Sequence, residues 1–414
     1  MTKKSDAPAI RFKGFSDAWE QRKLGELVDR VVRKNTNNES TLPLTISAQY
    51  GLVDQITYFN NRVASRDVSN YYLVLNGEFA YNKSTSDGYP FGAVKRLDLY
   101  EKGVLSTLYI VFAPKKEQQI DSDYLTVFFD TDRWHKGVAE RAAEGARNHG
   151  LLNISAEDFF DIDLSVPKDI VEQKQIGAFI RQLDNLITLH QRKFEKLTNV
   201  KKSMLEKMFP QNGSSYPEIR FKGFTDPWEQ RKLGDVVKEI TRNDPESEAP
   251  IMMITANNGF IEQSERYAFN NAGESLKKYI LLKKGELAYN HGASKLRPYG
   301  SCFALTTAEN ARIPFVYHCF SAENQNAEFM SIELNGAEIE NQLRKIVSSG
   351  ARMDGLLNIS FDEYTSVSVL LPGTEEQDRI ADFFRHLDNL ITLHQRELEK
   401  LQNIKKSMLE KMFV

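Results

Sequence analysis

The sequence lacks most of the features that mark secreted, disulfide-bonded or membrane-spanning proteins. Its 414 residues include two cysteines, Cys302 and Cys319, which excludes a disulfide scaffold and a four-cysteine zinc site. No stretch approaches about 18 consecutive apolar residues, so no membrane span is expected. The opening MTKKSDAPAI has no apolar core, so no signal peptide is expected either. We therefore expect a cytoplasmic protein with no membrane partner.

An excess of positive charge is also absent. The chain has 54 Lys and Arg against 57 Asp and Glu, a net charge of -3, so its overall charge gives no sign of a nucleic-acid partner. Any DNA binding must then use local basic patches or depend on a partner for much of the phosphate neutralisation. The 41% of hydrophobic and 27% of charged residues are typical of a globular protein and argue against disorder as the main state.

The strongest feature present is an internal repeat with a period of about half the chain. The copies agree closely at their openings, RFKGFSDAWEQRKLGELV and RFKGFTDPWEQRKLGDVV, and LDNLITLHQR and KKSMLEKMF each occur twice without change. The shorter motif GEFAYN returns as GELAYN, and GLLNIS occurs twice, each time shortly after Gly-Ala-Arg. These pairs begin at residues 11 and 220, 183 and 387, 201 and 405, 77 and 285, and 150 and 355. The chain is therefore a tandem duplication of one unit.

Between the matched motifs the two copies diverge strongly. Residues 29–70 and 84–144 have little counterpart in 238–276 and 293–349. Uneven drift after a recent duplication is one explanation. The more specific interpretation is two equivalent scaffolds that carry different specificities.

Each copy ends in a long amphipathic helix. Apolar residues spaced mostly by three and four predict helices over 172–209 and 376–413, and 38 residues span roughly 57 Å. One apolar stripe of this length must be buried, and the other copy is the natural partner in a coiled-coil-like pair. His190 and His394 occupy equivalent stripe positions, as structural histidines or, alternatively, for metal or proton chemistry. The residues predicted to pair the helices and dock partners are Leu183, Ile187, His190, Leu197, Met204, Leu387, Ile391, His394, Leu401 and Met408.

The globular parts are predicted to be β-rich and of the mixed α/β (α+β) class. Strands are expected over 71–75, 105–112, 162–166, 279–282, 314–320 and 366–371, and helices over 125–133, 139–147 and 327–348. The predicted domains are globular domain 1 (1–171), helix 1 (172–210), a polar linker (211–216), globular domain 2 (217–373) and helix 2 (374–414).

Motifs of the common enzyme chemistries are missing. The sequence has no G-x-x-x-x-G-K-[ST] phosphate loop, no [DN]-P-P-[YF] tetrapeptide, no H-E-x-x-H and no C-x-x-C. Asp169, Glu172 and Lys174 could suggest a nuclease, but the second copy does not keep this set. We therefore expect no catalytic residue, no metal site and no cofactor in this chain.

Two kinds of segment, together with two arginines, could contact a nucleic acid. One segment follows the Ala-Tyr-Asn turn, where small polar residues mix with Lys, Arg and Tyr; the other is a turn after a short strand. Ordinary solvated loops and turns, and structural salt bridges for the arginines, are the alternatives. The candidates are Gln49, Tyr50, Asn82, Lys83, Ser84, Ser86, Tyr89 and Arg147 in copy one, and Asn257, Asn258, Asn290, His291, Ser294, Lys295, Arg297 and Arg352 in copy two.

The whole chain resembles the specificity subunit of type I restriction-modification systems, and the sequences of its motifs are close to those of Staphylococcus-type members. The resemblance is carried by the globular–helix–globular–helix order, the Phe-Lys-Gly-Phe-x-x-x-Trp-Glu-Gln-Arg-Lys-Leu-Gly opening, Gly-Leu-Leu-Asn-Ile-Ser, and the Glu-Gln-x-x-Ile…Leu-Asp-x-Leu-Ile helix start. It implies two target recognition domains, each reading one half of a bipartite double-stranded DNA site. It also implies two long helices that pair as an antiparallel coiled coil, in a pseudo-two-fold repeat.

The resemblance further implies partners that carry the chemistry. The helices would set the spacer and dock two modification subunits, which bind S-adenosylmethionine and methylate adenine. Two restriction motor-nuclease subunits, using ATP and Mg²⁺, would complete the complex. The chain itself would be non-catalytic. The alternatives are a self-contained nuclease or methyltransferase and a two-domain coiled-coil protein scaffold without DNA reading.

Overall fold

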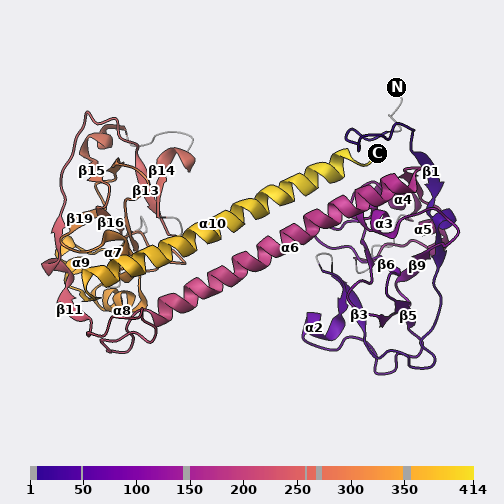
Figure 1. The fold of residues 1–414 in the computed structure, drawn as a ribbon, viewed down its shortest axis with the longest axis horizontal. Coiled ribbons are helices and arrows are strands. Elements are labelled where there is room, and N and C mark those ends of the chain that lie inside the picture. The colour runs from indigo at the N-terminus through magenta and orange to yellow at the C-terminus, as the bar shows by residue number, and fades with distance from the viewer. Residues whose placement is uncertain (1–6, 48–49, 143–149, 257–258, 267–272, 348–355) are drawn as a thin grey trace. The chain divides into compact units, whose positions relative to one another are not determined.

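The computed structural model describes residues 7–47, 50–142, 150–256, 259–266, 273–347 and 356–414 (Figure 1). The chain divides into two compact units, Met1–Arg192 with Gln395–Val414 (unit 1) and Lys193–His394 (unit 2). Each long helix therefore contributes one part to each unit. The domain limits expected from the sequence stay predictions, and the two units are described separately below.

Unit 1 contains a four-stranded antiparallel sheet in the order β2-β9-β6-β7, with strand pairs β1-β10, β3-β4 and β5-β8 beside it. Its strands are β1 (Glu20–Lys23), β2 (Val28–Arg30), β3 (Leu44–Ser47), β4 (Gly51–Asp54), β5 (Tyr72–Leu75), β6 (Phe79–Asn82), β7 (Ala93–Arg96), β8 (Lys102–Leu105), β9 (Ile110–Pro114) and β10 (Asp163–Val166). Its helices are α1 (Leu24–Leu27), α2 (Gln55–Phe59), α3 (Ser122–Phe128), α4 (His135–Arg141), α5 (Ala156–Phe160) and the first part of α6 (Ile170–Lys207).

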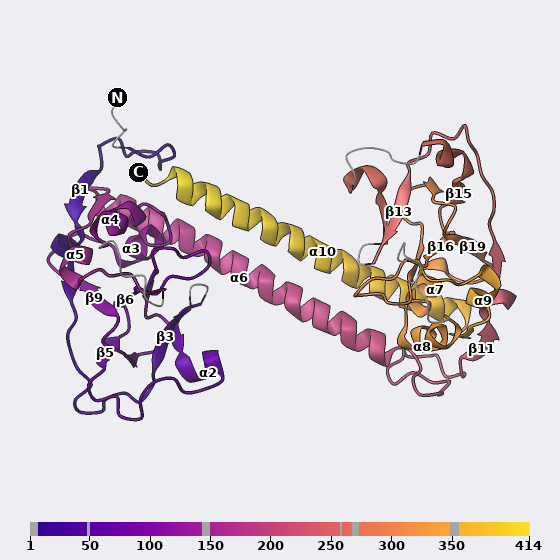
Figure 2. The same ribbon diagram turned by 180° about the vertical axis from the view of Figure 1, so that it is seen from behind.

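Unit 2 repeats this topology strand for strand, with the sheet β12-β19-β16-β17 and the pairs β11-β20, β13-β14 and β15-β18 (Figure 2). Its strands are β11 (Glu229–Lys232), β12 (Val237–Glu239), β13 (Met252–Thr255), β14 (Gly259–Glu262), β15 (Ile280–Lys283), β16 (Leu287–Asn290), β17 (Ser301–Ala304), β18 (Asn310–Ile313), β19 (His318–Ala322) and β20 (Ser368–Leu371). Its helices are α7 (Ala327–Glu333), α8 (Ala337–Ile346), α9 (Phe361–Thr365) and the first part of α10 (Thr374–Lys411).

Four predicted strands, β5, β10, β15 and β20, and both long helices are confirmed. The helix predicted over 125–133 lies earlier, as α3, and the one predicted over 139–147 overlaps only the end of α4, with 143–147 outside the described residues. The strand predicted over 105–112 is wrong in extent, because a turn closed by Tyr109 N and Ser106 O (3.2 Å) separates β8 from β9. The strand predicted over 314–320 is interrupted in the same way by Tyr317 N and Pro314 O (3.0 Å). The helix predicted over 327–348 breaks at Gly336, which is the N-cap of α8. The long helices each begin and end two residues earlier than predicted.

The start of each long helix is fastened to the opening motif of its repeat. In unit 1 the Arg11 guanidinium donates to both oxygens of the fully buried Glu172 carboxylate, at 2.6 and 2.8 Å. In unit 2 Arg220 holds Glu376 in the same way, at 2.7 Å for both bonds. A buried carboxylate paired by a two-pronged arginine is a structural fastening. Glu172 and Glu376 therefore have the same structural role in the two units.

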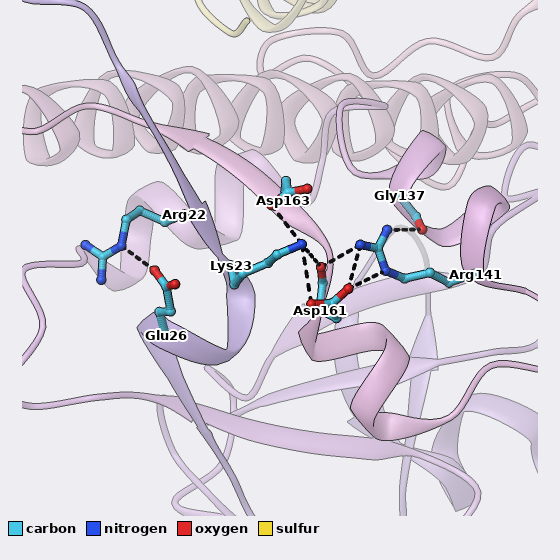
Figure 3. A network of polar contacts seen from close by, with 7 residues as sticks. All are labelled: Arg22, Lys23, Glu26, Gly137, Arg141, Asp161 and Asp163. Carbon is cyan, nitrogen blue, oxygen red and sulfur yellow. Dashed lines mark hydrogen bonds and ion pairs between the residues drawn. The ribbon is translucent and has the colours of Figure 1, made fainter.

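A second polar network in unit 1 ties α4 to the turn between α5 and β10 (Figure 3). Arg141 donates to Asp161 Oδ2 (2.8 Å), and Lys23 contacts Asp161 (3.3 Å) and Asp163 (3.1 Å). The Arg141 guanidinium, together with Lys23, holds the pKa of the Asp161 carboxyl below its ordinary value. The network fixes the chain just before β10 and at its first residue, and β10 leads into α6.

The long helices pair with each other inside each unit. In unit 1 Leu183 of α6 is buried in the core cluster against which Leu401 and Met408 of α10 pack, and Lys405 contacts Asp184 (2.7 Å). In unit 2 Leu387 of α10 is buried in the cluster that includes Leu197 and Met204 of α6, and Lys201 contacts Asp388.

In both units, therefore, an early turn of one helix meets a late turn of the other, so the pairing is antiparallel as expected. Between these contacts Ile187, His190, Ile391 and His394 are half-buried. The leucines on the neighbouring face are more exposed: Leu186 (44%), Leu189 (45%), Leu390 (44%) and Leu393 (51%). The middle of each helix thus keeps apolar surface that the pair does not cover.

The last residues of each helix close the core of a globular part. In unit 1 Phe413 lies edge-on to Trp19 and stacks on Tyr124, with ring centroids 6.1 and 5.6 Å apart. In unit 2 Phe209 makes the equivalent contacts with Trp228 (5.7 Å) and Phe329 (5.8 Å). The unchanged Lys-Met-Phe ending of KKSMLEKMF is therefore a core anchor.

Candidate functional site

The Ala-Tyr-Asn segment, expected to be a turn, ends strand β6 in unit 1 and β16 in unit 2. The candidate residues that follow it occupy the loop that joins the third and fourth strands of each sheet. In unit 1 Asn82 ends β6, and its side-chain oxygen accepts a hydrogen bond from Ser84 N (3.0 Å). Ser86 and Tyr89 then exchange backbone hydrogen bonds (3.3 and 2.9 Å), which closes a tight turn. In unit 2 the Asn290 side chain accepts from Gly292 N (2.9 Å). Each loop is therefore fixed at its base and exposed at its tip.

The repeated GLLNIS segment lies beside this loop in both units. In unit 1 Leu152 N donates to Lys83 O (3.0 Å) and Thr85 N donates to Gly150 O (2.6 Å). In unit 2 Leu357 N donates to His291 O (2.9 Å). The candidate loop and the GLLNIS segment, which lie far apart in the sequence, are thus joined by backbone hydrogen bonds.

The other candidate segment, expected as a turn after a short strand, follows the first strand of a two-stranded hairpin in each unit. β3 pairs with β4 in unit 1, and β13 pairs with β14 in unit 2. In unit 2 the Asn290 side chain donates to Ile254 O (3.1 Å), which ties the hairpin to the sheet. A side chain on Gly259, at φ +65°, would lie 3.2 Å from the Phe303 ring of β17. The hairpin therefore packs against the strands that carry the candidate loop.

Several candidate side chains are engaged inside the protein. Lys83 Nζ donates to Ile154 O (3.3 Å), and both ring nitrogens of His291 face backbone carbonyls, Leu357 O at 2.7 Å and Val316 O at 2.6 Å. Arg297 donates to Asn335 O (2.9 Å), and burial lowers the pKa of its guanidinium. These contacts give the three residues a structural role, whatever else they contact.

Other candidates face solvent. Tyr50 is 63% exposed next to the hairpin turn, and Ser84, Ser86, Ser294 and Lys295 are exposed in the loops. Gln49, Arg147, Asn257, Asn258 and Arg352 lie outside the described residues. The structure thus gathers the described candidates of each unit around one end of its sheet, and their contacts with DNA stay predictions.

The sequence prediction missed two features that the structure displays. Leu186, Leu189, Leu390 and Leu393 were not among the predicted docking residues, although the unchanged repetition of LDNLITLHQR was a signal for them. The turn between α7 and α8, near Arg297, was hidden inside one predicted helix.

Among the described residues, no group of three or more His, Cys, Asp or Glu could hold a metal ion. In the same part of the chain, no helix is long and apolar enough to cross a membrane.

Comparisons with known proteins agree with the duplicated architecture. Residues 17–199 match the family model described as "Type I restriction modification DNA specificity domain". The Type I restriction enzyme MjaVIII specificity subunit of Methanocaldococcus jannaschii is 24% identical over 379 residues, which cover 85% of this chain and 82% of that protein. The putative MjaX specificity subunit of the same organism is 21% identical and is matched over 94% of this chain and 92% of its own length.

A solved structure shares the fold over the full length. The crystal structure of a type I restriction-modification system S subunit from M. genitalium aligns over 99% of both chains, with a TM-score of 0.57 and 13% sequence identity. At this identity the likeness concerns the fold alone. It covers both globular parts and both long helices.

Proposed function

We propose that the chain is a type I restriction-modification DNA specificity subunit and that each of its globular parts reads one half of a bipartite double-stranded DNA site, which the matched family model and the full-length relatives support. The observation that carries this proposal is the repeat itself. Both units build the same strand framework, and in both the candidate loop is bonded to the GLLNIS segment. The segments that differ between the copies, 29–70 and 84–144 against 238–276 and 293–349, include the hairpin and most of this loop.

The paired helices then serve as the spacer and as a docking site. We propose that they set the distance between the half-sites and bind two modification subunits. The exposed leucine pairs, Leu186 with Leu189 and Leu390 with Leu393, support docking, because apolar surface of this kind on a polar helix suits a helical partner.

Catalysis belongs to the partners in this proposal. The modification subunits bind S-adenosylmethionine and methylate an adenine, which must be flipped out of the base stack. Two motor-nuclease subunits use ATP and Mg²⁺. The net charge of -3 also supports a partner that supplies most phosphate contacts. Tight, site-specific DNA binding by the isolated chain at moderate salt would contradict that last part.

The test exchanges one of the two globular parts. Residues 12–170 are replaced by the corresponding part of another family member, and N6-methyladenine is mapped by single-molecule sequencing in cells that also carry the modification subunits. We expect one methylated half-site to change and the other to stay. The reciprocal exchange of residues 221–372 is the matched control and must change the other half-site.

One outcome of this exchange and one separate assay of the purified chain would favour the alternatives. A scaffold without DNA reading leaves both half-sites unchanged. A self-contained methyltransferase or nuclease modifies or cuts DNA when the purified chain is supplied with S-adenosylmethionine and Mg²⁺ alone, and either activity would contradict the division of labour proposed here.

A further inference from the structure

Unit 2 contains a cavity of about 550 Å³ on the sheet side of the helix pair. It lies between the end of α6, β17, the α7–α8 turn and the early turns of α10, all of which belong to unit 2. Three aromatic rings, Phe209, Phe303 and Phe384, line it together with the carboxylates Glu328 and Glu333. The lining therefore combines apolar surface with negative charge.

The corresponding place in unit 1 is occupied by an arginine of the chain itself. In the strand registers, Arg96 of β7 lies opposite Phe79 of β6, and Ala304 of β17 lies opposite Leu287 of β16. Arg96 and Ala304 are therefore equivalent positions. The Arg96 side chain is 8% exposed, and it contacts Asp98 (2.7 Å) and Asp123 (2.8 Å).

The acidic partner of that arginine is kept in unit 2. Asp123 pairs with Arg96 and with Arg181 of α6 (2.6 Å). Its counterpart Glu328 pairs with Arg385 of α10 (3.0 Å), which is the counterpart of Arg181. Since Ala304 replaces Arg96, one of the two cations found at this position in unit 1 is missing.

A second carboxylate is added where unit 1 has an aromatic ring. Glu333 is the last residue of α7, as Phe128 is the last residue of α3, and Phe128 packs on Phe413 with ring centroids 6.3 Å apart. Glu333 is 8% exposed and lines the cavity. Its Oε1 accepts a hydrogen bond from Leu370 N (3.1 Å), and no other described residue bonds or pairs with this carboxylate. A buried carboxylate without a cationic partner is costly to ionise, and a bound cation would offset this cost.

We propose that this cavity is a binding site for a planar cation, a guanidinium or amidinium group on an apolar stem. The cation lies between Ala304, at the position that Arg96 has in unit 1, and Glu333, which is its main partner; both residues line the cavity. The rings of Phe209, Phe303 and Phe384 cover the stem and stabilise the positive charge through their faces. A free small molecule and an arginine side chain of an assembly partner share this chemistry.

The other charges around the cavity are largely neutralised within the protein. Lys201 pairs with Asp388, and Arg385 pairs with Glu328. The remaining charged lining residues, besides Glu333, are Lys202, Glu206, Arg297 and Glu338. They balance one another, so ionisation of Glu333 decides the net charge that a ligand meets. Burial raises the pKa of Glu333 to about 7, and we therefore expect cation affinity to rise with pH between 6 and 8.

Benzamidine is the probe, and benzamide is its neutral control of nearly the same shape. Binding to the full-length chain is measured by isothermal titration calorimetry. We expect saturable binding of benzamidine at least tenfold tighter than that of benzamide. Glu333→Gln should weaken benzamidine at least tenfold and remove its dependence on pH. Glu157→Gln, at an exposed carboxylate of unit 1, is the matched control and should change nothing.

Ala304→Arg restores the arginine of unit 1 and should abolish binding. Ala304→Leu fills the cavity without a charge and serves as the second variant if the first does not fold, with folding checked by circular dichroism. Equal binding of benzamidine and benzamide would overturn the proposal. So would undiminished binding to a folded Ala304→Arg or Ala304→Leu variant, or the absence of saturable binding to the isolated chain.

The same titration on the assembled complex separates the two sources. If benzamidine still binds, the site is open to a free small molecule. If binding is lost on assembly while the isolated chain binds, a cationic side chain of a partner occupies the cavity. Both results support a cation-binding site, and they differ only in whether a free small molecule or a side chain of a partner supplies the cation.

Discussion

At the scale of single residues, the two units show how one framework tolerates different chemistry at equivalent positions. Phe128 and Glu333 end equivalent helices, yet one packs in an aromatic cluster and the other brings a carboxylate into a cavity. Gly177 and Ala381 are likewise equivalent, each one residue after the first buried isoleucine of its long helix. Such pairs make each unit a natural control for the other.

Glu333 should make the stability of unit 2 fall as the pH rises from about 4.5 to 7. The pKa of Glu333 is raised from 4.5 to about 7 by burial, so in this range the unfolded chain has released a proton that the folded chain keeps. The slope is about 1.4 kcal/mol per pH unit, or about 3 kcal/mol in all. Glu333→Gln should remove this slope, measured by urea denaturation at several pH values.

Glu206→Gln changes another carboxylate that lines the same cavity and is the control for this measurement. It should leave the slope in place. A slope that survives in Glu333→Gln would mean that Glu333 is not the group responsible.

Gly177→Ala should destabilise unit 1 although alanine is the better helix former. A Cβ at this position would lie 2.8 Å from Asp123 Cβ and 2.9 Å from Tyr124 N, because α6 approaches α3 closely. The clash with backbone should outweigh the gain in helix propensity of about 1 kcal/mol, giving a net loss of about 1–3 kcal/mol. Hydrogen-exchange mass spectrometry should show faster exchange in α3. Unchanged or slower exchange there would contradict the close approach.

At the scale of elements, the long helices are held by their ends more than by their middles. The first turns are fastened by the Arg11–Glu172 and Arg220–Glu376 pairs, and the last turns by Phe413 and Phe209. Gln173 and Gln377 add hydrogen bonds to the chain just before each helix, at Pro167 O (2.8 Å) and Pro372 O (2.9 Å). The repeated KKSMLEKMF ending therefore reflects equivalent packing of Phe209 and Phe413 in the two cores.

Phe413→Ala should open the core of unit 1 selectively. Removing this buried ring deletes its contacts with Trp19, Tyr124 and Phe128, at a cost of about 3–5 kcal/mol. Phe209→Ala is the matched change and should act on unit 2 instead. Hydrogen exchange resolved by peptide distinguishes the two. Equal protection losses in both units from either variant would show that the units do not unfold separately.

At the scale of the whole molecule, the proposed function gives one duplicated chain two DNA-reading parts. The proposed division of labour needs the helices as a spacer. Inserting four residues in the middle of both helices, after Lys193 and after Arg396, adds about 6 Å to each, or roughly two base pairs of DNA. We expect the methylated site to gain one or two spacer base pairs with both half-sites unchanged, as mapped by single-molecule sequencing. An altered half-site sequence would contradict a pure spacer role.

The sequence by itself determined the repeat, the two long helices to within two residues, and the positions of four strands, β5, β10, β15 and β20. These features follow from local periodicity and from identity between copies, both of which are present in the linear chain. Turns inside apolar runs, such as those at Ser106–Tyr109 and Pro314–Tyr317, were not predictable, because buried strands and buried turns share the same apolar residues.

Only the tertiary structure decided which distant segments meet. Backbone hydrogen bonds between Lys83 and Leu152, and between His291 and Leu357, join loops about 70 residues apart. Backbone N–H and C=O groups are the same in nearly every residue, so the sequence does not indicate which of them pair. The role of Ala304 became visible in the same way, through its register opposite Leu287 and the absence of the side chain that Arg96 supplies in unit 1. A cavity is a property of what surrounds it, so no single stretch of sequence could have indicated it.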